Sequence, residues 1–204
     1  MDKIILGLLM LRRLTLYEIR AIIKSNLGTM CSDGMGSIQS ALKKLLSAEF
    51  IACYEFVEKS VNKKQYSITD KGRSELLCWL QTPADLTNAK NMELGKFFFM
   101  GLLPAAQRPP LIGEIVSILE KELAEMQKLQ SAIQLTENKK QVLDYWENDK
   151  EYAGGIQAAT QTDITESVNS IGDFQMLTLQ YAIDLFKFNI EWFKKINDSH
   201  GREA

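Results

Sequence analysis

The sequence predicts a mainly α-helical protein with one small β-hairpin. Three observations support this fold class. Apolar residues recur at three- and four-residue steps over most of the chain, a β-branched and aromatic run occurs between residues 50 and 69, and residues 171–196 carry two apolar seams. With 204 residues, the chain is long enough to bury a core without disulfides.

The composition is that of an ordinary globular protein. Charged residues make up 25% of the chain and apolar residues 46%, which favours neither wholesale disorder nor insertion into a membrane. The apolar run 4–11 is short and ends at Arg12 and Arg13, so we interpret it as a helix and not as a signal peptide. Cys31, Cys53 and Cys78 fit no metal-binding spacing, and we expect a reducing, cytoplasmic location.

Two helices are predicted at the start of the chain. Residues 3–11 contain more apolar positions than one stripe holds, so we expect this helix to be covered on two sides. Thr15 and Glu18 have the spacing of a capping box and begin the second helix. Gly28 is expected to end that helix in the left-handed conformation.

A third helix is predicted after Gly34 and Gly36, with Ser37 as its N-cap and a buried face that runs from Ile38 to Leu46. Its outward positions are polar or cationic, and none is acidic: Gln39, Ser40, Lys43, Lys44 and Ser47. Such a face suits a groove lined by phosphates. An ordinary solvated face is the alternative, and the helix by itself favours it.

After the third helix, the spacing of the apolar residues changes from that of a helix to that of strands. Residues 50–58 and 65–69 have the composition of two strands, and the polar segment between them contains Asn62 as a turn former. Thr69 or Asp70 is predicted to cap a fourth helix over residues 71–80.

Three helices and a hairpin are the winged-helix arrangement, in which the third helix enters the major groove and the hairpin tip contacts the DNA backbone. The tip carries Lys59, Lys63 and Lys64, whose charges suit that role. A solubilising surface loop is the alternative interpretation of the tip.

The stretches GSIQSALKKLLSAEFI and NKKQYSITDKGRSEL resemble the recognition helix and wing of the PadR-like winged-helix transcriptional regulators. The segments 4–9 and 16–19 resemble the first two helices of that family. The resemblance implies an N-terminal winged-helix domain over 1–81, a C-terminal antiparallel long-helix dimerisation domain, and a homodimer that binds double-stranded DNA. Gln39 and Ser40 stand where the family usually has an aromatic residue and a proline, so the operator sequence is left open.

The second half of the chain is predicted to form long helices over residues 92–204, after a linker over 82–91. An aromatic run in 92–103 indicates a short buried helix. Pro109 and Pro110 begin a helix that continues to about Trp146. A break at residues 154–155 and a polar stretch precede the last helix.

The last helix, predicted over 171–196, has two apolar seams and therefore needs neighbours on two sides. A long antiparallel helix covers one seam, formed by Leu179, Ile183, Phe186, Ile190 and Phe193. We assign the other seam to a second subunit: Phe174, Leu177, Tyr181, Leu185, Phe188 and Trp192.

Charge is unevenly distributed along the chain. Residues 1–81 contain 12 Lys and Arg against 8 Asp and Glu, whereas residues 82–204 contain 12 against 18. The sequence thus predicts a homodimeric DNA-binding transcriptional regulator that reads a pseudo-palindrome, with a repressor favoured over an activator and the direction of regulation left open. Its DNA contacts are predicted to be made by Tyr17, Ser37, Gln39, Ser40, Lys43, Lys44, Lys59, Lys63 and Lys64. The alternative is a winged-helix dimer that acts as a protein interaction module.

Other chemistry has little support in the sequence. The single histidine, His200, lies in a polar tail, so no histidine-based catalytic arrangement or metal site is expected, and no enzyme activity or cofactor is predicted. Trp79, Phe97 and Trp146 are candidates for lining a site for a small aromatic effector, with the hydrophobic core as the alternative. A redox role for Cys31 is left open.

Overall fold

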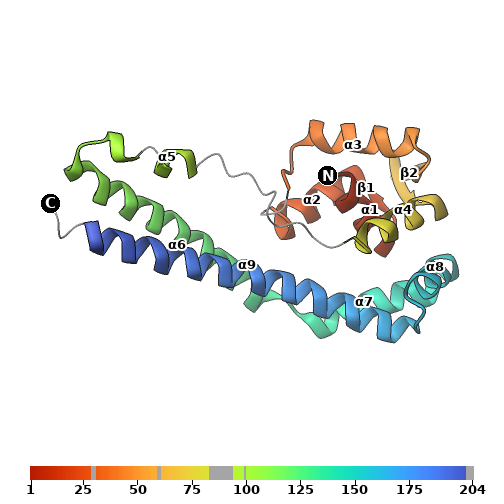
Figure 1. Cartoon of the computed structure of the whole chain (residues 1–204). Helices are drawn as coiled ribbons and strands as arrows, with labels where there is room; N and C mark the ends of the chain where they lie inside the picture. The colour runs from red at the N-terminus through yellow and green to blue at the C-terminus, as the bar shows by residue number, and fades with distance from the viewer. Residues whose placement is uncertain (29–30, 59–60, 83–93, 99, 201–204) are drawn as a thin grey trace. The chain divides into compact units, whose positions relative to one another are not determined.

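The computed structural model describes residues 1–28, 31–58, 61–82, 94–98 and 100–200. The chain forms two compact units (Figure 1). Unit 1 consists of residues 1–84 and 139–168, and unit 2 consists of residues 85–138 and 169–204. Both units are mainly helical, and unit 1 contains a small antiparallel sheet, which confirms the predicted fold class.

Unit 1 opens with three helices and a hairpin in the predicted order. The elements are α1 (Asp2–Leu11), β1 (Leu14–Thr15), α2 (Leu16–Asn26), α3 (Met35–Ser47), β2 (Ile51–Glu58), β3 (Val61–Ile68) and α4 (Asp70–Leu80). The sequence did not reveal β1, which pairs with β3 and makes a sheet of order β1-β3-β2. A strand of two residues is too short for a period of two to be recognised.

The capping box at the start of α2 is confirmed. The amide of Glu18 donates to the hydroxyl of Thr15 at 3.3 Å, and the amide of Thr15 donates to the Glu18 carboxylate at 2.7 Å. The prediction for Gly28 is wrong, because α2 already ends with Leu27 as its C-cap and no glycine in the described part of the chain has a positive φ.

Two predictions about the hairpin and the helix before it are also wrong. Ser37 is not an N-cap, since α3 begins at Met35 with Gly34 as its N-cap. Asn62 does not form the turn, because it pairs with Val57 inside the sheet. The ladder continues to the end of both strands, so the wing is longer than its polar sequence suggested.

Helix α1 is the centre of unit 1. Ile5, Leu6 and Leu9 are completely buried, and α1 lies between α3 and α8 (Lys150–Thr160), as Figure 1 shows. The prediction that this helix is covered on two sides is therefore confirmed. Burial of a leucine or isoleucine contributes about 1.5–3 kcal/mol, so the three residues form a large part of the core of the unit.

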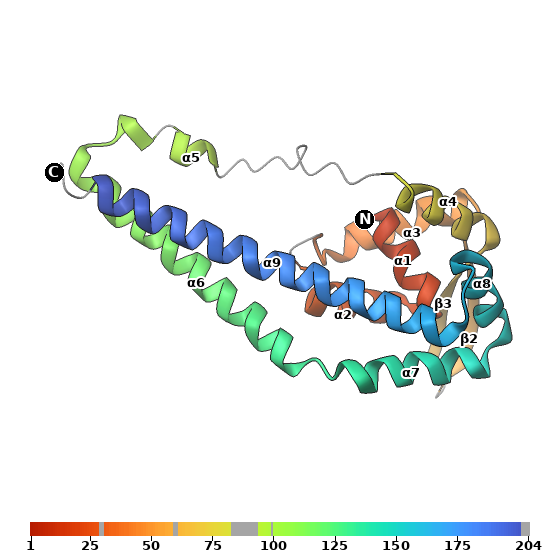
Figure 2. The same cartoon turned by 60° about the horizontal axis from the view of Figure 1, so that its bottom comes forward.

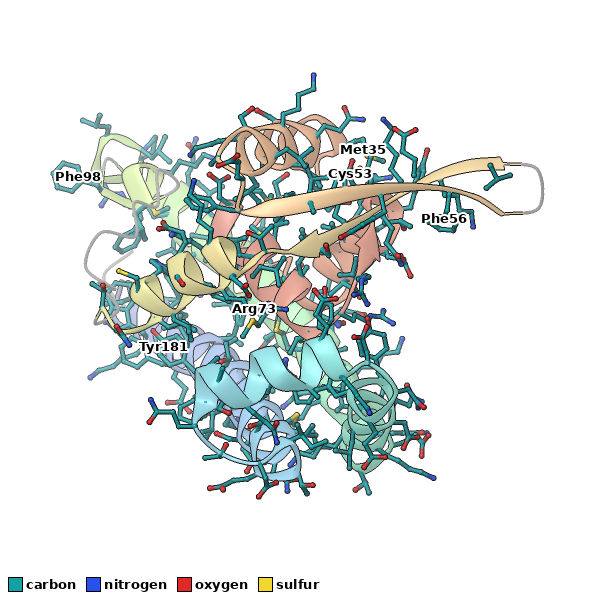
Figure 3. The ribbon with its side chains drawn as sticks, turned by 90° about the vertical axis from the view of Figure 1, so that its right-hand side faces the viewer. Met35, Cys53, Phe56, Arg73, Phe98 and Tyr181 are labelled. Carbon is teal, nitrogen blue, oxygen red and sulfur yellow. The ribbon has the colours of Figure 1, made fainter. Side chains whose placement is uncertain are left out.

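The second segment of unit 1 differs from the sequence-based expectation. The helix predicted to continue to about Trp146 is interrupted after α6 (Arg108–Ala132), and α7 (Leu135–Asn148) follows. The predicted break at Gly154 and Gly155 is absent, because both glycines lie inside α8. A Cβ on Gly155 would lie 2.7 Å from the guanidinium carbon of Arg73, so this glycine admits the Arg73 side chain (Figure 3).

Polar contacts hold α7 and α8 against the end of α1. The buried indole of Trp146 donates to the carbonyl of Leu11 at 2.9 Å. Arg13 forms ion pairs with Asp149 and Glu151, and its guanidinium carbon lies 4.8 Å from the centre of the Tyr152 ring. Residues 139–168 thus pack with the N-terminal helices, whereas sequence reasoning had grouped them with 92–204.

Unit 2 is built around two long antiparallel helices, α6 and α9 (Ile164–His200), which lie side by side in Figure 2. Their side chains are linked by Gln130 to Gln180 at 3.0 Å and by Lys194 to Glu120 at 2.6 Å. The buried cluster consists of Met100, Ile112, Val116, Ile190 and Phe193. Helix α9 starts earlier and ends later than the predicted range of 171–196.

Short elements precede α6. They are α5 (Leu94–Phe98) and two 3₁₀ turns, η2 (Met100–Leu102) and η3 (Ala105–Gln107). Pro109 and Pro110 lie in the first turn of α6, as predicted. The predicted linker over 82–91 falls, apart from Thr82, outside the described residues.

The described helices include none that is both long and apolar enough to cross a bilayer. Within the same residues, no group of three or more histidines, cysteines or carboxylates could hold a metal ion. Cys31, Cys53 and Cys78 are free thiols.

The buried tyrosine of α8 makes unit 1 sensitive to alkaline pH. Tyr152 is 1% exposed, and burial, together with the neighbouring Tyr145, raises its pKa to about 12. In the unfolded chain Tyr152 ionises near pH ~10, whereas the folded chain keeps it neutral, so stability is lost as the pH rises from about 10 to about 12. Between pH 8 and about 11.5, we expect the free energy of unfolding of Tyr152→Phe to fall by about 2 kcal/mol less than that of the wild type. Urea unfolding at each pH measures this difference.

The matched control is Tyr17→Phe, since Tyr17 is 74% exposed. The control should show the same alkaline loss of stability as the wild type. Parallel curves for Tyr152→Phe and the wild type would contradict this account of Tyr152.

Candidate nucleic-acid interface

The outer face of α3 is polar and exposed, as predicted. Ser37, Gln39, Ser40 and Lys43 all lie on the surface. The opposite face is buried and consists of Ile38, Ala41, Leu42 and Leu45. Because Ser40 and Lys43 are three residues apart and Gln39 and Lys43 four apart, the three side chains are neighbours on one surface of the helix. Together they form an acid-free patch of donors.

Lys44 differs from Lys43 in its surroundings. Its ammonium group lies 2.6 Å from the carboxylate of Asp2 at the start of α1, and this hydrogen bond raises the pKa of Lys44. One residue along a helix is a rotation of about 100°, which points Lys44 toward α1 while Lys43 stays on the outer face. Sequence reasoning treated the two lysines as equivalent, because only the tertiary structure reveals the position of Asp2.

Contacts from α2 hold the segment that leads into α3. The side chain of Arg20 donates to the backbone carbonyl of Asp33 at 3.1 Å and lies 3.6 Å from the Asp33 carboxylate. The hydroxyl of Ser32 accepts a bond from the amide of Gly34 at 3.2 Å. Sequence reasoning did not identify Arg20 as a residue that holds this segment. The only indication in the sequence was a basic residue on the exposed side of α2.

Hydrogen bonds connect the turn that follows α3 to the start of α4. Thr69 donates from its hydroxyl to the carbonyl of Glu49 at 2.8 Å and from its amide to the carbonyl of Phe50 at 3.1 Å. The Thr69 hydroxyl also accepts from the amide of Gly72 at 3.1 Å, which confirms Thr69 as the N-cap of α4. Glu49 has a φ of 61°, and the bond from Thr69 fixes this turn.

The wing extends beyond the helices in Figure 3. Lys63 and Lys64 are exposed on β3, and Lys64 forms an ion pair with Glu55 of β2 at 2.8 Å. Lys59 lies outside the described residues. Sequence reasoning missed two exposed rings on β2: Tyr54, which is 57% exposed, and Phe56, which is 37% exposed. The sequence did indicate that the two rings share one face of the strand, because Tyr54 and Phe56 alternate with Glu55.

The remaining candidates have separate surroundings. Tyr17 is exposed on the first turn of α2. Trp146 is completely buried in unit 1, whereas Trp79 is 46% exposed on α4. In unit 2, Phe97 packs edge-on against Trp192 with ring centroids 5.6 Å apart. A cavity of unit 1 between α1, α3 and α4 is lined by other residues, which include Lys3, Leu6, Phe50 and Glu75.

The two seams of α9 are in different environments. In the inner seam Ile183, Ile190 and Phe193 are at most 9% exposed, and Leu179 and Phe186 are half-buried. The other seam is exposed along its whole length: Phe174 69%, Leu177 60%, Tyr181 55%, Leu185 46%, Phe188 61% and Trp192 40%. A continuous exposed apolar surface of this kind usually marks an interaction site.

By sequence, the chain is similar to the negative transcriptional regulator PadR of Bacillus subtilis. The two are 29% identical over 125 residues, which cover 60% of this chain and 69% of the relative. No protein-family model matches the chain.

By structure, the chain is similar to Bacillus subtilis PadR in complex with operator DNA, with a TM-score of 0.71 and 21% identity over 98% of this chain and 96% of the other. PadR in complex with p-coumaric acid gives a TM-score of 0.65 at 22% identity, with 98% of each chain covered. The Vibrio cholerae virulence activator AphA gives 0.67 at 19% identity, over 100% and 99% of the two chains. Together with the relative found by sequence, these matches confirm the predicted PadR-like resemblance.

Substitution of Gly72 is expected to disturb the contact between α4 and the residues that follow α3. A Cβ at Gly72 would lie 2.0 Å from the carbonyl oxygen of Phe50, so backbone would have to move. We expect Gly72→Ala to lower the free energy of unfolding by at least about 2 kcal/mol, measured by urea unfolding with circular dichroism.

Gly7→Ala is the matched control, because a Cβ at Gly7 has no heavy atom within 4 Å and alanine favours a helix by about 1 kcal/mol. The control should be as stable as the wild type or more so. Equal stability of Gly72→Ala and Gly7→Ala would show that the close approach is not a constraint.

Proposed function

We propose, from the premise that the chain is PadR-like, that it is a DNA-binding transcriptional regulator whose α3 enters the major groove. The observation that carries this proposal is the exposed, acid-free patch of Ser37, Gln39, Ser40 and Lys43 on α3. The similarity in fold to PadR in complex with operator DNA supports the same use of the fold. The wing supplies Lys63, Lys64 and, in this proposal, Lys59 to the adjacent phosphates.

Gln39 and Lys43 are the proposed base-reading residues. Glutamine pairs with the N6 and N7 edge of adenine, and lysine pairs with O6 and N7 of guanine. The two residues are four positions apart, a rise of about 6 Å along the helix, which corresponds to one or two base pairs. The proposed half-site therefore contains a guanine and an adenine at this spacing, while Ser37, Ser40 and Tyr17 contact the backbone or either base.

The proposed regulator is a homodimer, because the exposed seam of α9 from Phe174 to Trp192 would be buried against a second copy. A two-fold dimer presents two copies of α3 and so reads a pseudo-palindrome. Repression is the proposed outcome of binding, since the relative found by sequence is a negative regulator.

A small aromatic compound is the proposed effector. PadR, which has a similar fold, has been solved in complex with p-coumaric acid. The exposed rings of this chain include Trp79, whereas Trp146 and Phe97 are engaged in packing and would have to be reached through a rearrangement. Release of DNA on binding is the proposed effect, through a change in the spacing of the two copies of α3.

Substitution of Lys43 tests DNA binding directly. We expect Lys43→Ala to weaken binding to a duplex from the chain's own upstream region about tenfold, because a base contact worth ~1–3 kcal/mol is lost. Lys44→Ala is the matched control and should weaken binding less, since Lys44 is engaged by Asp2. Fluorescence anisotropy measures the affinity of both variants and of the wild type.

Unchanged binding in Lys43→Ala would overturn the proposal and would favour the alternative, a dimer that acts as a protein interaction module. The direction of regulation is read from a reporter under the same upstream region. Lys43→Ala should raise expression if the protein is a repressor, and a fall would show an activator.

The effector is tested with p-coumaric acid. We expect its addition to a preformed protein–DNA complex to release the DNA, seen as a fall in anisotropy, and to quench tryptophan fluorescence. Hexanoate, an aliphatic acid of the same charge, is the control. Equal effects of the two acids would reject an aromatic site, and no effect of either would reject p-coumaric acid as the effector.

A further inference from the structure

A small cavity lies in unit 1, between the start of α1, the end of α3 and the middle of α4. Its volume is about 190 Å³, and its apolar walls are formed by Leu6, Leu45, Ala48 and Phe50. Leu6 and Leu45 are at most 2% exposed, so they form the floor of the cavity. Because an apolar cavity of ~150 Å³ holds a benzene molecule, this one has room for a branched chain of four carbons.

Charged side chains line the same cavity. Lys44 of α3 pairs with Asp2 of α1 at 2.6 Å, and Lys3 of α1 pairs with Glu75 of α4. These four side chains are between 29% and 76% exposed. They therefore form the mouth of the cavity, where a ligand from solvent meets two cations and two carboxylates above an apolar floor.

The wall at Phe50 is held in place by its neighbours. The ammonium group of Lys71 lies 5.4 Å from the centre of the Phe50 ring. The amide of Phe50 donates to the carbonyl of Leu45 at 3.0 Å, and its own carbonyl accepts from the amide of Thr69 at 3.1 Å. A site whose walls are already ordered loses little entropy when it binds a ligand.

We propose that this cavity binds a small apolar α-amino acid of the size of leucine. The apolar side chain of the ligand enters the space above Leu6 and Leu45. Its carboxylate pairs with Lys3 and Lys44 at the mouth, and its ammonium group pairs with the two carboxylates there. Occupancy of this site does not require DNA, so its test stands apart from that of the proposed function.

The balance of charge at the mouth favours a ligand that carries both signs. An anion would take a lysine from its partner and leave a carboxylate without a cation, and a cation would leave a lysine without a carboxylate. A zwitterion offers a partner of opposite sign to every charged side chain at the mouth. Because exposed ion pairs contribute little to stability, exchange of their partners for those of the ligand costs little.

The position of the charges above an apolar floor favours an α-amino acid over other zwitterions. In an α-amino acid the ammonium group, the carboxylate and the side chain are attached to one carbon. With that carbon at the mouth, both charges meet the charged side chains while the side chain is buried, and burial of the apolar group supplies the gain in binding. An ω-amino acid has its charges at opposite ends of the chain, so it has no apolar branch to bury.

Titration of the isotope-labelled, full-length chain with L-leucine tests the site by NMR. We expect saturable shifts of the amide signals of Leu6, Leu45 and Ala48, with a dissociation constant in the low millimolar range. The amide signals of unit 2 should not shift. The absence of shifts at the cavity residues with ~20 mM leucine, or shifts confined to other residues, would overturn the proposal.

Analogues of leucine test the chemical class of the ligand. Isocaproate lacks the ammonium group, isoamylamine lacks the carboxylate, and ε-aminocaproate is an isomer of leucine with both charges but no branch. We expect each to bind at least about tenfold more weakly than leucine. Equal binding of isocaproate or isoamylamine would reject a zwitterion site, and equal binding of ε-aminocaproate would reject recognition of the apolar side chain.

A variant that fills the cavity is an independent check. We expect Ala48→Leu to weaken leucine binding more than about tenfold, because the added branch occupies the space of the ligand. The matched control is Ala21→Leu, the same substitution at an exposed position of α2 away from the cavity, which should bind as the wild type does. Unchanged binding in Ala48→Leu would overturn the site. Urea unfolding checks that both variants fold, and the analogue series on the wild type decides the matter if Ala48→Leu does not.

Discussion

The close approach of Gly72 to the carbonyl of Phe50 is the constraint on which the placement of α3 and the wing in unit 1 depends. It brings the start of α4 within hydrogen-bond distance of the corner between α3 and β2, where Thr69 bonds to the carbonyls of both Glu49 and Phe50. Because Thr69 follows directly after β3 and Phe50 directly precedes β2, the same contacts fix the base of the wing relative to α3. A basic helix and a basic hairpin can contact one DNA duplex together only if their relative position is fixed.

Helix α1 carries the other half of this support. Its residues Ile5, Leu6 and Leu9 are buried between α3 on one side and α8 on the other, and polar contacts join α3 and α7 to its two ends. Asp2 binds Lys44 of α3 at one end, while the carbonyl of Leu11 accepts from Trp146 at the other. A displacement of α7 would therefore act on the end of the helix that packs against α3.

In unit 2, helix α9 has one apolar seam that packs within the chain and a second that is exposed. The inner seam of α9 is satisfied within the chain by α6, and the bonds between Gln130 and Gln180 and between Lys194 and Glu120 set the register of that pair. The outer seam has no such cover among the described residues, although its end at Trp192 is already ordered by Phe97. An interface that is ordered before association loses less entropy when it forms, which suits a stable dimer.

The sequence by itself determined the order of the first three helices, the hairpin and the fourth helix, the capping box at Thr15, a cap of α4 at Thr69 or Asp70, the acid-free face of α3 and the two seams of α9. These features depend on periodicity and on contacts within a few residues, which a linear pattern records. Only the tertiary structure decided that Gly155 admits Arg73 inside α8, that Gly72 meets Phe50, and that residues 139–168 pack on α1. It also separated Lys43 from Lys44, because the partner of Lys44 is Asp2, which is distant in sequence. Contacts between residues far apart in the chain leave no local pattern, and for that reason sequence reasoning missed them.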